Sequence, residues 1–241
     1  MMTFSLRTTR EILRDPLNLA FGLGFPVVLI LLLSAIQANI PVSLFEIQHL
    51  SPGICIFGLS FLTLFAATLI ARDRSSALLQ RLYTTPLTAR DFILGYTLPI
   101  LPIGLGQTAV CYAFAVLLGL DITPNLLPAM LAVIPAALFY IFLGLLCGSI
   151  FTDRQVGGIC GALLTNLSAW LSGVWFDLDL VGGVFKKIAY ALPFVHAVEL
   201  ERAVLNADSG QILSHLLWVL AYAAVTAAAA IYAFLRQMNR Q

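Results

Sequence analysis

The sequence predicts an all-α integral membrane protein that crosses the bilayer six times and keeps both termini on the cytoplasmic side. Three observations lead to this prediction: an apolar composition, six long runs free of charge, and a one-sided distribution of basic residues. Of the 241 residues, 60% are apolar and 10% are charged. Soluble domains have about 25% charged and about 45–50% apolar residues. We therefore expect a single transmembrane domain over residues 1–241.

Six apolar runs contain no charged residue, and each matches the roughly 20 residues that a helix needs to cross the hydrocarbon. They cover residues 17–38, 52–71, 92–120, 128–151, 156–176 and 212–235. A seventh apolar run, 188–198, has about half of that length and lies between charged residues. It predicts an interfacial or re-entrant helical segment on the outer side, between the fifth and sixth spans.

The basic residues indicate how the six spans are oriented. If the N-terminus is inside, 10 of the 13 lysines and arginines fall on inner segments. The outer segments then hold only Lys186, Lys187 and Arg202. Because cytoplasmic loops concentrate basic residues, this distribution favours an inner N-terminus. An even number of spans returns the C-terminus to the same side.

Residues before the first span predict an interfacial helix. One face at helical spacing carries Arg7, Arg10, Glu11 and Arg14. The other face is expected to carry Phe4, Ile12 and Leu13. A helix with these two faces can lie flat at the inner membrane surface.

Two spans begin with recognisable capping signals. Asp15 and Pro16 fit the start of the first span, with Asp at the N-cap and Pro at the first helical position. Thr88 and Asp91 fit a capping box that opens the third span. Each signal fixes the residue at which the chain enters a span.

No catalytic or metal-binding set is visible in the sequence. Four cysteines lie singly in apolar stretches, and the three histidines are scattered, so we expect no metal site. Metalloprotease and phosphate-loop motifs do not occur. Uncharged spans also argue against a carrier driven by protons or ions, because such carriers hold titratable groups at membrane depth. An intramembrane enzyme and a self-powered carrier or channel remain the alternatives.

The inner loop between the second and third spans predicts a short amphipathic helix. Ser75 is placed to cap it, and Pro86 forces its end. Its apolar face consists of Leu78, Leu79, Leu82 and Tyr83. Such a helix can rest on the bilayer surface, or it can dock on a soluble partner and receive force from it. We favour the second interpretation, since the chain shows no energy source of its own.

This loop resembles the permease subunits of type-two ATP-binding-cassette exporters. The family pattern runs from a charged start through Leu-x-x-Leu and Thr/Ser-Pro-Leu to a glycine in the next span. Here these elements are 72–74, Leu79 with Leu82, 85–87, and Gly95. Where the family often has a basic residue after that glycine, this chain has Tyr96.

Two further segments extend the resemblance over essentially the whole chain. Residues 10–16 resemble the N-terminal surface helix of the family, and residues 193–202 resemble its outer motif before the last span. Residues placed at the exit by this likeness are Pro193, His196, Glu199 and Arg202. Glu199 and Arg202 are three positions apart and can pair on a helix.

The resemblance implies an ATP-driven exporter that is not itself an enzyme. Two permease copies, identical or different, would form the substrate pathway as a dimer in a bacterial plasma (inner) membrane. Two separate ATPase subunits would use ATP and magnesium, while this chain would bind no cofactor and no nucleic acid. The ATPase-docking residues would be Ser75, Leu78, Leu79, Arg81, Leu82, Tyr83, Thr85 and Pro86.

In relatives the second and fifth spans tend to line the pathway. On the second span, Phe57, Phe61 and Phe65 recur every four residues, and on the fifth Asn166 and Trp170 share a face. We expect these five residues to contact a hydrophobic or amphiphilic substrate, such as a drug, lipid, glycan or peptide. Packing between helices and contact with lipid are the alternative roles for each of them.

Overall fold

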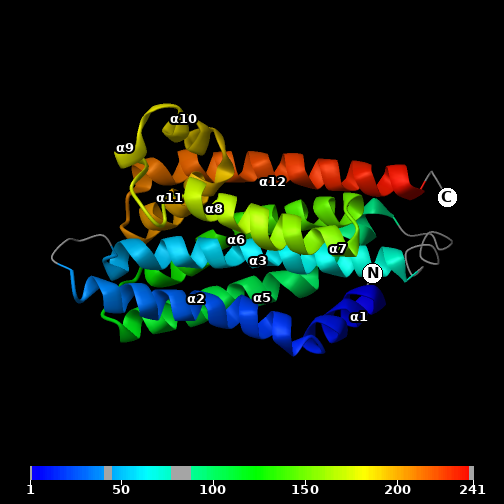
Figure 1. Cartoon of the computed structure of the whole chain (residues 1–241), viewed down its shortest axis with the longest axis horizontal. Helices are drawn as coiled ribbons and strands as arrows, with labels where there is room; N and C mark the ends of the chain where they lie inside the picture. The colour runs from blue at the N-terminus through cyan, green and yellow to red at the C-terminus, as the bar shows by residue number, and fades with distance from the viewer. Residues whose placement is uncertain (1, 41–44, 77–87, 239–241) are drawn as a thin grey trace.

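The computed structural model describes residues 2–40, 45–76 and 88–238, and within these ranges it contains helices and no strand. Figure 1 shows the long helices side by side along the longest axis, with both termini at one end. We call this the terminus end. The opposite end, which carries residues 178–205, is called the far end.

Among the described residues, five helices are long and apolar enough to cross a membrane. They are α2 (Pro16–Gln37), α3 (Ile47–Ser75), α5 (Ala89–Leu117), α6 (Leu126–Ile150) and α12 (Ser209–Met238). These helices contain the first, second, third, fourth and sixth predicted spans. The protein is therefore a multi-pass membrane protein built from helices.

The fifth predicted span, 156–176, has a different structure. The chain follows a helical path through α7 (Asp153–Val156), the π-helix η1 (Gly157–Leu164) and α8 (Thr165–Leu171). The path contacts α3 over its length, although none of its three parts is long enough alone to span. It ends earlier than predicted because Gly173 adopts a left-handed φ of +71°, which glycine tolerates without strain.

Helix α3 is the centre of the bundle. Of its most apolar window 83% is buried, against 22% for α2 and 17% for α12. Gly144 and Gly148 of α6 let the two backbones approach closely, since an added Cβ would lie 2.5 Å from the Thr63 carbonyl oxygen and 2.6 Å from that of Ala67. Two small residues four positions apart, typical of close contacts between membrane helices, thus bring α6 against α3.

The second glycine pair of the sequence, Gly157 and Gly161, behaves differently. An added Cβ on Gly161 would meet Leu64 of α3 at 3.3 Å, as expected for a packing position. Gly157 has nothing within 4 Å and is exposed, so it makes no close approach to another element among the described residues.

Helix α1 (Met2–Leu13) lies against α5 and α2 at the terminus end. As predicted, Ile12 is buried, but Leu13 is 66% exposed. Arg7 departs from the prediction more strongly, because its side chain points into the bundle instead of sharing a solvated face with Arg10 and Arg14. The cause is a buried carboxylate on α3.

The predicted re-entrant segment, 188–198, is divided between α10 (Gly183–Ala191) and α11 (Pro193–Leu205). A shorter helix, α9 (Leu178–Val181), precedes them. All three lie at the far end (Figure 1), and none is long enough to cross a membrane. The prediction of a non-spanning segment between the last two spans is confirmed.

Candidate functional site

The terminus end of α3 carries a buried carboxylate, Asp73, which is only 2% exposed. Both of its oxygens accept hydrogen bonds from the Arg7 guanidinium, at 2.6 and 3.1 Å. The Tyr96 hydroxyl of α5 donates to Asp73 Oδ2 at 2.6 Å. A bidentate Arg–carboxylate pair fixes the orientation of both partners. Asp73 therefore joins α3 to α1 and α5 at one point.

Glu11 of α1 completes this cluster. Its carboxylate accepts a hydrogen bond from Arg7 at 2.8 Å. Burial and the neighbouring charge of Asp73 raise the pKa of Glu11. The hydrogen bond to Asp73 in turn raises the pKa of Arg7. One guanidinium thus serves two carboxylates, which holds α1 in place against the bundle.

The two arginines beside Asp73 reach other elements. Arg72 lies 3.5 Å from the Asp15 carboxylate at the start of α2 and 4.0 Å from that of Asp153 in α7. Arg74 donates to the carbonyl oxygens of Ser149 and Phe151 at the end of α6. These carbonyls have no partner within their own helix, and a cation there is favourable.

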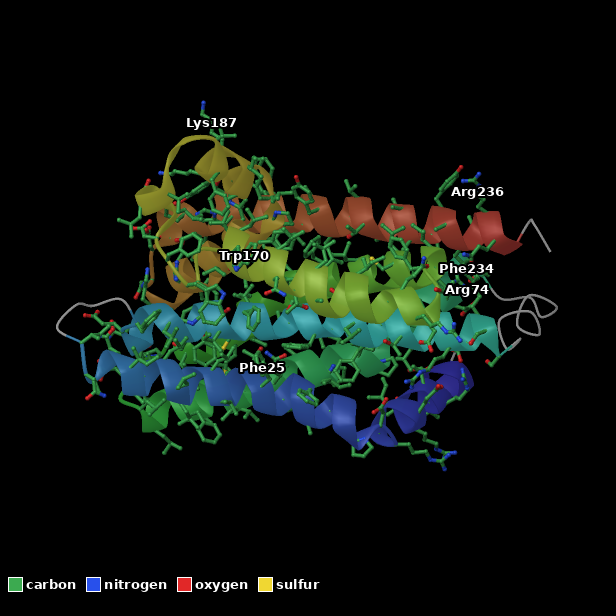
Figure 2. The ribbon with its side chains drawn as sticks, in the orientation of Figure 1. Phe25, Arg74, Trp170, Lys187, Phe234 and Arg236 are labelled. Atoms are coloured by element: carbon green, nitrogen blue, oxygen red, sulfur yellow. The ribbon has the colours of Figure 1, made fainter. Side chains whose placement is uncertain are left out.

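We call residues 72–74 the α3 junction. Three consecutive side chains connect α3 to α1, α2, α5, α6 and α7. Figure 2 labels Arg74 and Phe234, which both lie at the terminus end of the bundle. There Phe234 stacks on Phe92 of α5, with ring centroids 4.0 Å apart. A displacement of this end of α3 must therefore disturb most of the bundle.

The segment after the junction contains nearly all of the predicted docking helix. Leu78, Leu79, Arg81, Leu82, Tyr83, Thr85 and Pro86 lie outside the described residues. Ser75 is described, and it is the last residue of α3. Its hydroxyl donates to the Arg72 carbonyl at 2.9 Å, which closes the last turn of α3. Its predicted role as a cap stays a prediction, because the helix that it would cap lies outside the described residues.

The residues that follow this segment, at the start of α5, have the predicted structure. The Thr88 hydroxyl accepts from the Asp91 amide at 3.3 Å, and the Asp91 carboxylate accepts from the Thr88 amide at 3.1 Å. This is the expected capping box at the start of α5. The segment 77–87 is therefore held between two anchored helix ends.

The predicted aromatic stripe of the second span lies between helices. Phe57 and Phe65 are buried, and Phe61 contacts Phe25 of α2 at a centroid distance of 5.6 Å. Phe57 also contacts Trp175 at 5.7 Å, in the turn that follows α8. The stripe is thus part of the α2–α3 contact, and through Trp175 it reaches the last residues of the fifth predicted span, beyond the end of α8.

The two predicted residues of the fifth span face outward. Asn166 is exposed, and Trp170, one turn further, is 54% exposed (Figure 2). Asn166 donates its amide nitrogen to the Ala162 carbonyl at 2.7 Å. In this single chain neither residue meets the phenylalanine stripe, so the structure does not bring the two predicted halves of the pathway together.

The far end has a cavity of about 460 Å³, which we call the far-end cavity. Aromatic residues Trp175, Phe176 and Tyr190 line it together with four charged side chains. The charged lining residues are Asp177, Asp179, Glu199 and Arg202. Two of the four predicted exit residues, Glu199 and Arg202, therefore line a cavity.

The predicted pairing of those two residues is confirmed. Arg202 donates to Glu199 at 2.8 Å, and it also donates to the His49 carbonyl of α3 at 3.2 and 3.3 Å. Arg202 is 8% exposed, so these bonds fix α11 against α3. The Arg202 guanidinium is therefore partly occupied by hydrogen bonds within the protein.

The other two predicted exit residues have structural positions. Pro193 is the first residue of α11. His196 is buried, with ring nitrogens 2.9 Å from His215 Nδ1 and 3.0 Å from the Tyr190 carbonyl. Its ring stacks on Trp218 of α12 at 4.9 Å. These contacts attach α11 to α12. Pro193 and His196 do not line the far-end cavity.

Sequence reasoning missed one buried acid, Glu201. It is fully buried, and its Oε1 accepts from the Tyr112 hydroxyl of α5 at 2.7 Å. Its Oε2 has no partner among the described residues. Burial raises the pKa of Glu201 well above its usual value. The signal was available, because Glu201 shares the helical face of the buried residues Phe194 and Val198.

Within the described ranges, no group of three or more His, Cys, Asp and Glu side chains is placed to hold a metal ion. A family model described as ABC-2 type transporter matches residues 1–206, which is most of the chain. A comparison with curated proteins gave no match.

Proposed function

The chain belongs to the ABC-2 type transporter family, and we propose that it is the permease subunit of an exporter driven by separate ATPase subunits. Two copies would form the pathway, and one ATPase would dock on residues 75–85 of each copy. The observation that carries this proposal is the α3 junction. It stands directly before the docking segment and connects α3 to five other elements.

The proposal includes six spans with both termini in the cytoplasm. The path through α7, η1 and α8 covers residues 153–171, about the length that the hydrocarbon requires. With this path as the fifth span, the chain alternates in direction and both termini lie at one end, as Figure 1 shows. The basic residues of that end favour the cytoplasm of a bacterial cell, with the far end outside.

Coupling would work through differential contacts. ATP can shift the permease between two states only if the ATPase contacts residues 75–85 differently in each state. The capping box at Thr88 and the junction at Asp73 hold both ends of this segment. A displacement of residues 75–85 by the ATPase is therefore expected to move α3 and α5 together.

The exposed face of η1 and α8 supports pairing of two copies. Gly157, Gly158, Ala162 and Asn166 lie exposed on this path, beside the larger side chains Leu163 and Trp170. Small residues and interhelical hydrogen bonds are typical of helix–helix contacts in membranes. An amide side chain facing lipid is unfavourable, and a second copy would cover it.

The phenylalanine stripe supports a hydrophobic or amphiphilic substrate. Phe61, Phe57 and Trp175 form a continuous set of ring contacts that ends at the far-end cavity. Pairing at the neighbouring η1–α8 face would place this set near the axis of the dimer. We propose that the substrate passes along it toward the far-end cavity.

The test is purification of the full chain from its native membrane. We expect a soluble ATPase to accompany it, and we expect the double variant Leu79→Asp with Leu82→Asp to lose that ATPase. Leu127→Asp is the matched control, because Leu127 is 64% exposed at the start of α6, at the far end. Unchanged assembly and ATP turnover in the double variant would refute docking at this segment.

A further inference from the structure

We propose that the far-end cavity binds an apolar organic cation. The inference gives a substrate class to the site placed at the exit of the pathway, and in that respect it rests on the proposed function. The volume of the far-end cavity, about 460 Å³, lies within the range of about 300–1,000 Å³ typical of small-molecule sites. Its lining combines flat aromatic surfaces with a few charged groups, as such sites do.

The charges of the lining favour a cation. Three carboxylates, those of Asp177, Asp179 and Glu199, face one guanidinium, that of Arg202. Arg202 is already bonded to Glu199 and to a backbone carbonyl. Asp177 accepts a hydrogen bond from the Asp179 amide but has no cationic partner among the described residues. Since Glu199 is paired with Arg202 and Asp179 with Lys186, the excess negative charge of the cavity is that of Asp177.

The protein itself shows how a cation fits at the rim. Lys186 of α10 forms an ion pair with Asp179, and its ammonium lies 5.6 Å from the centre of the Tyr190 ring. An acid and an aromatic face thus already hold one cation together. Asp177 and Trp175 also line the cavity, which supplies a further carboxylate and a further aromatic ring.

The apolar part of such a ligand also has a place. Trp175 joins the cavity to Phe57, and Phe176 contacts Phe185 at a centroid distance of 6.1 Å. The exposed side chain of Leu180 also lines the cavity. A small hydrated ion would leave these surfaces unused, whereas a cation carrying aromatic groups would cover them.

The experiment measures equilibrium binding of tetraphenylphosphonium to the full chain in detergent. Tetraphenylborate, which has nearly the same size and the opposite charge, is the matched probe. We expect the phosphonium to bind and the borate to bind much more weakly. Equal binding of the two ions, or tighter binding of the borate, would overturn the proposal.

Two variants locate the binding site. Asp177→Asn keeps an N-cap for α9, because Asn caps as well as Asp, and it should weaken phosphonium binding about fivefold. Lys186→Gln frees Asp179 and the Tyr190 ring, and it should strengthen binding. Asp208→Asn, in the exposed turn before α12, is the control and should change nothing. Unchanged binding in both cavity variants would refute this site.

The binding experiment and the test of the proposed function can fail independently of each other. If the chain retains a co-purifying ATPase but no phosphonium binds, the exporter assignment stands and the substrate class is wrong. If the cation binds in the cavity and no ATPase ever accompanies the chain, the cavity is a cation site and the coupling proposal fails.

Discussion

The Arg7 guanidinium of α1 holds both carboxylate oxygens of Asp73 at the end of α3, at 2.6 and 3.1 Å. These residues are 66 positions apart, and the pair closes the bundle where the proposed docking segment begins. Arg7→Ala would leave a carboxylate that is 2% exposed without its cation. We expect a loss of about 2–4 kcal/mol in unfolding free energy, since removing one partner strands a buried charge.

The measurement is thermal unfolding in detergent. Arg10→Ala is the control, because Arg10 is exposed on the same helix and should change stability by less than about 0.5 kcal/mol. The combined variant Arg7→Met with Asp73→Asn should recover part of the loss, because both charges then disappear together. Equal effects of the Arg7 and Arg10 variants would show that the pair does not form.

Tyr96→Phe tests the third member of the cluster. It removes the 2.6 Å hydrogen bond to Asp73 and leaves the edge-to-face contact of the ring with Phe92, so we expect a loss of about 1–2 kcal/mol. Tyr232→Phe is the matched control, since Tyr232 is 67% exposed on α12. If both variants unfold at the same temperature, Tyr96 does not support Asp73.

Because Glu201 is buried, we predict that the unfolding free energy falls as the pH rises. Burial raises the pKa of Glu201 in the folded chain, whereas the unfolded chain releases this proton near pH 4.3. Above that pH the unfolded state binds fewer protons, so the unfolding free energy decreases, by at most about 1.4 kcal/mol per pH unit, until the folded pKa is reached. Glu201→Gln has no proton to lose and can still accept from Tyr112.

The unfolding free energy of both proteins should therefore be compared from pH 5 to pH 8. The advantage of Glu201→Gln over the parent chain should grow across this window. Tyr112→Phe is the control, because it removes the hydrogen bond of Glu201 but keeps the buried carboxyl and its pH dependence. Parallel curves for Glu201→Gln and the parent chain would contradict the raised pKa.

Asn166 tests the proposed contact between two copies. A cysteine at this exposed position should form a disulfide between copies when an oxidant is added to native membranes. The four native cysteines are buried, so they should contribute no such product. Val225→Cys is the control, because Val225 is 65% exposed on α12, a helix that the proposal leaves facing lipid. A cross-link only at position 225 would place the dimer contact elsewhere.

The sequence predicted the parts of the fold that depend on neighbouring residues. Charge-free runs located the long helices, Thr88 and Asp91 marked the start of α5, and the spacing of Glu199 and Arg202 predicted their ion pair. Each of these signals is contained within one turn or one helix. Such local patterns are visible without knowing what lies beside them.

The parts that failed depend on distant partners. Helical periodicity grouped Arg7 with the solvated arginines of α1, but its position is set by Asp73 on another helix. Glu201 was not singled out in the sequence, and the hydroxyl that it bonds belongs to Tyr112, 89 positions away. The early end of the fifth path has a local cause instead, because Gly173 adopts a φ of +71° just after α8 ends at Leu171.

The central claim is that this chain transports only with energy from a separate ATPase. Flux of a labelled organic cation into inside-out vesicles tests this claim most directly, with the permease alone and with its co-purified ATPase. We predict flux only when both proteins and magnesium-ATP are present. Equal flux from the permease alone, without nucleotide, would contradict the account.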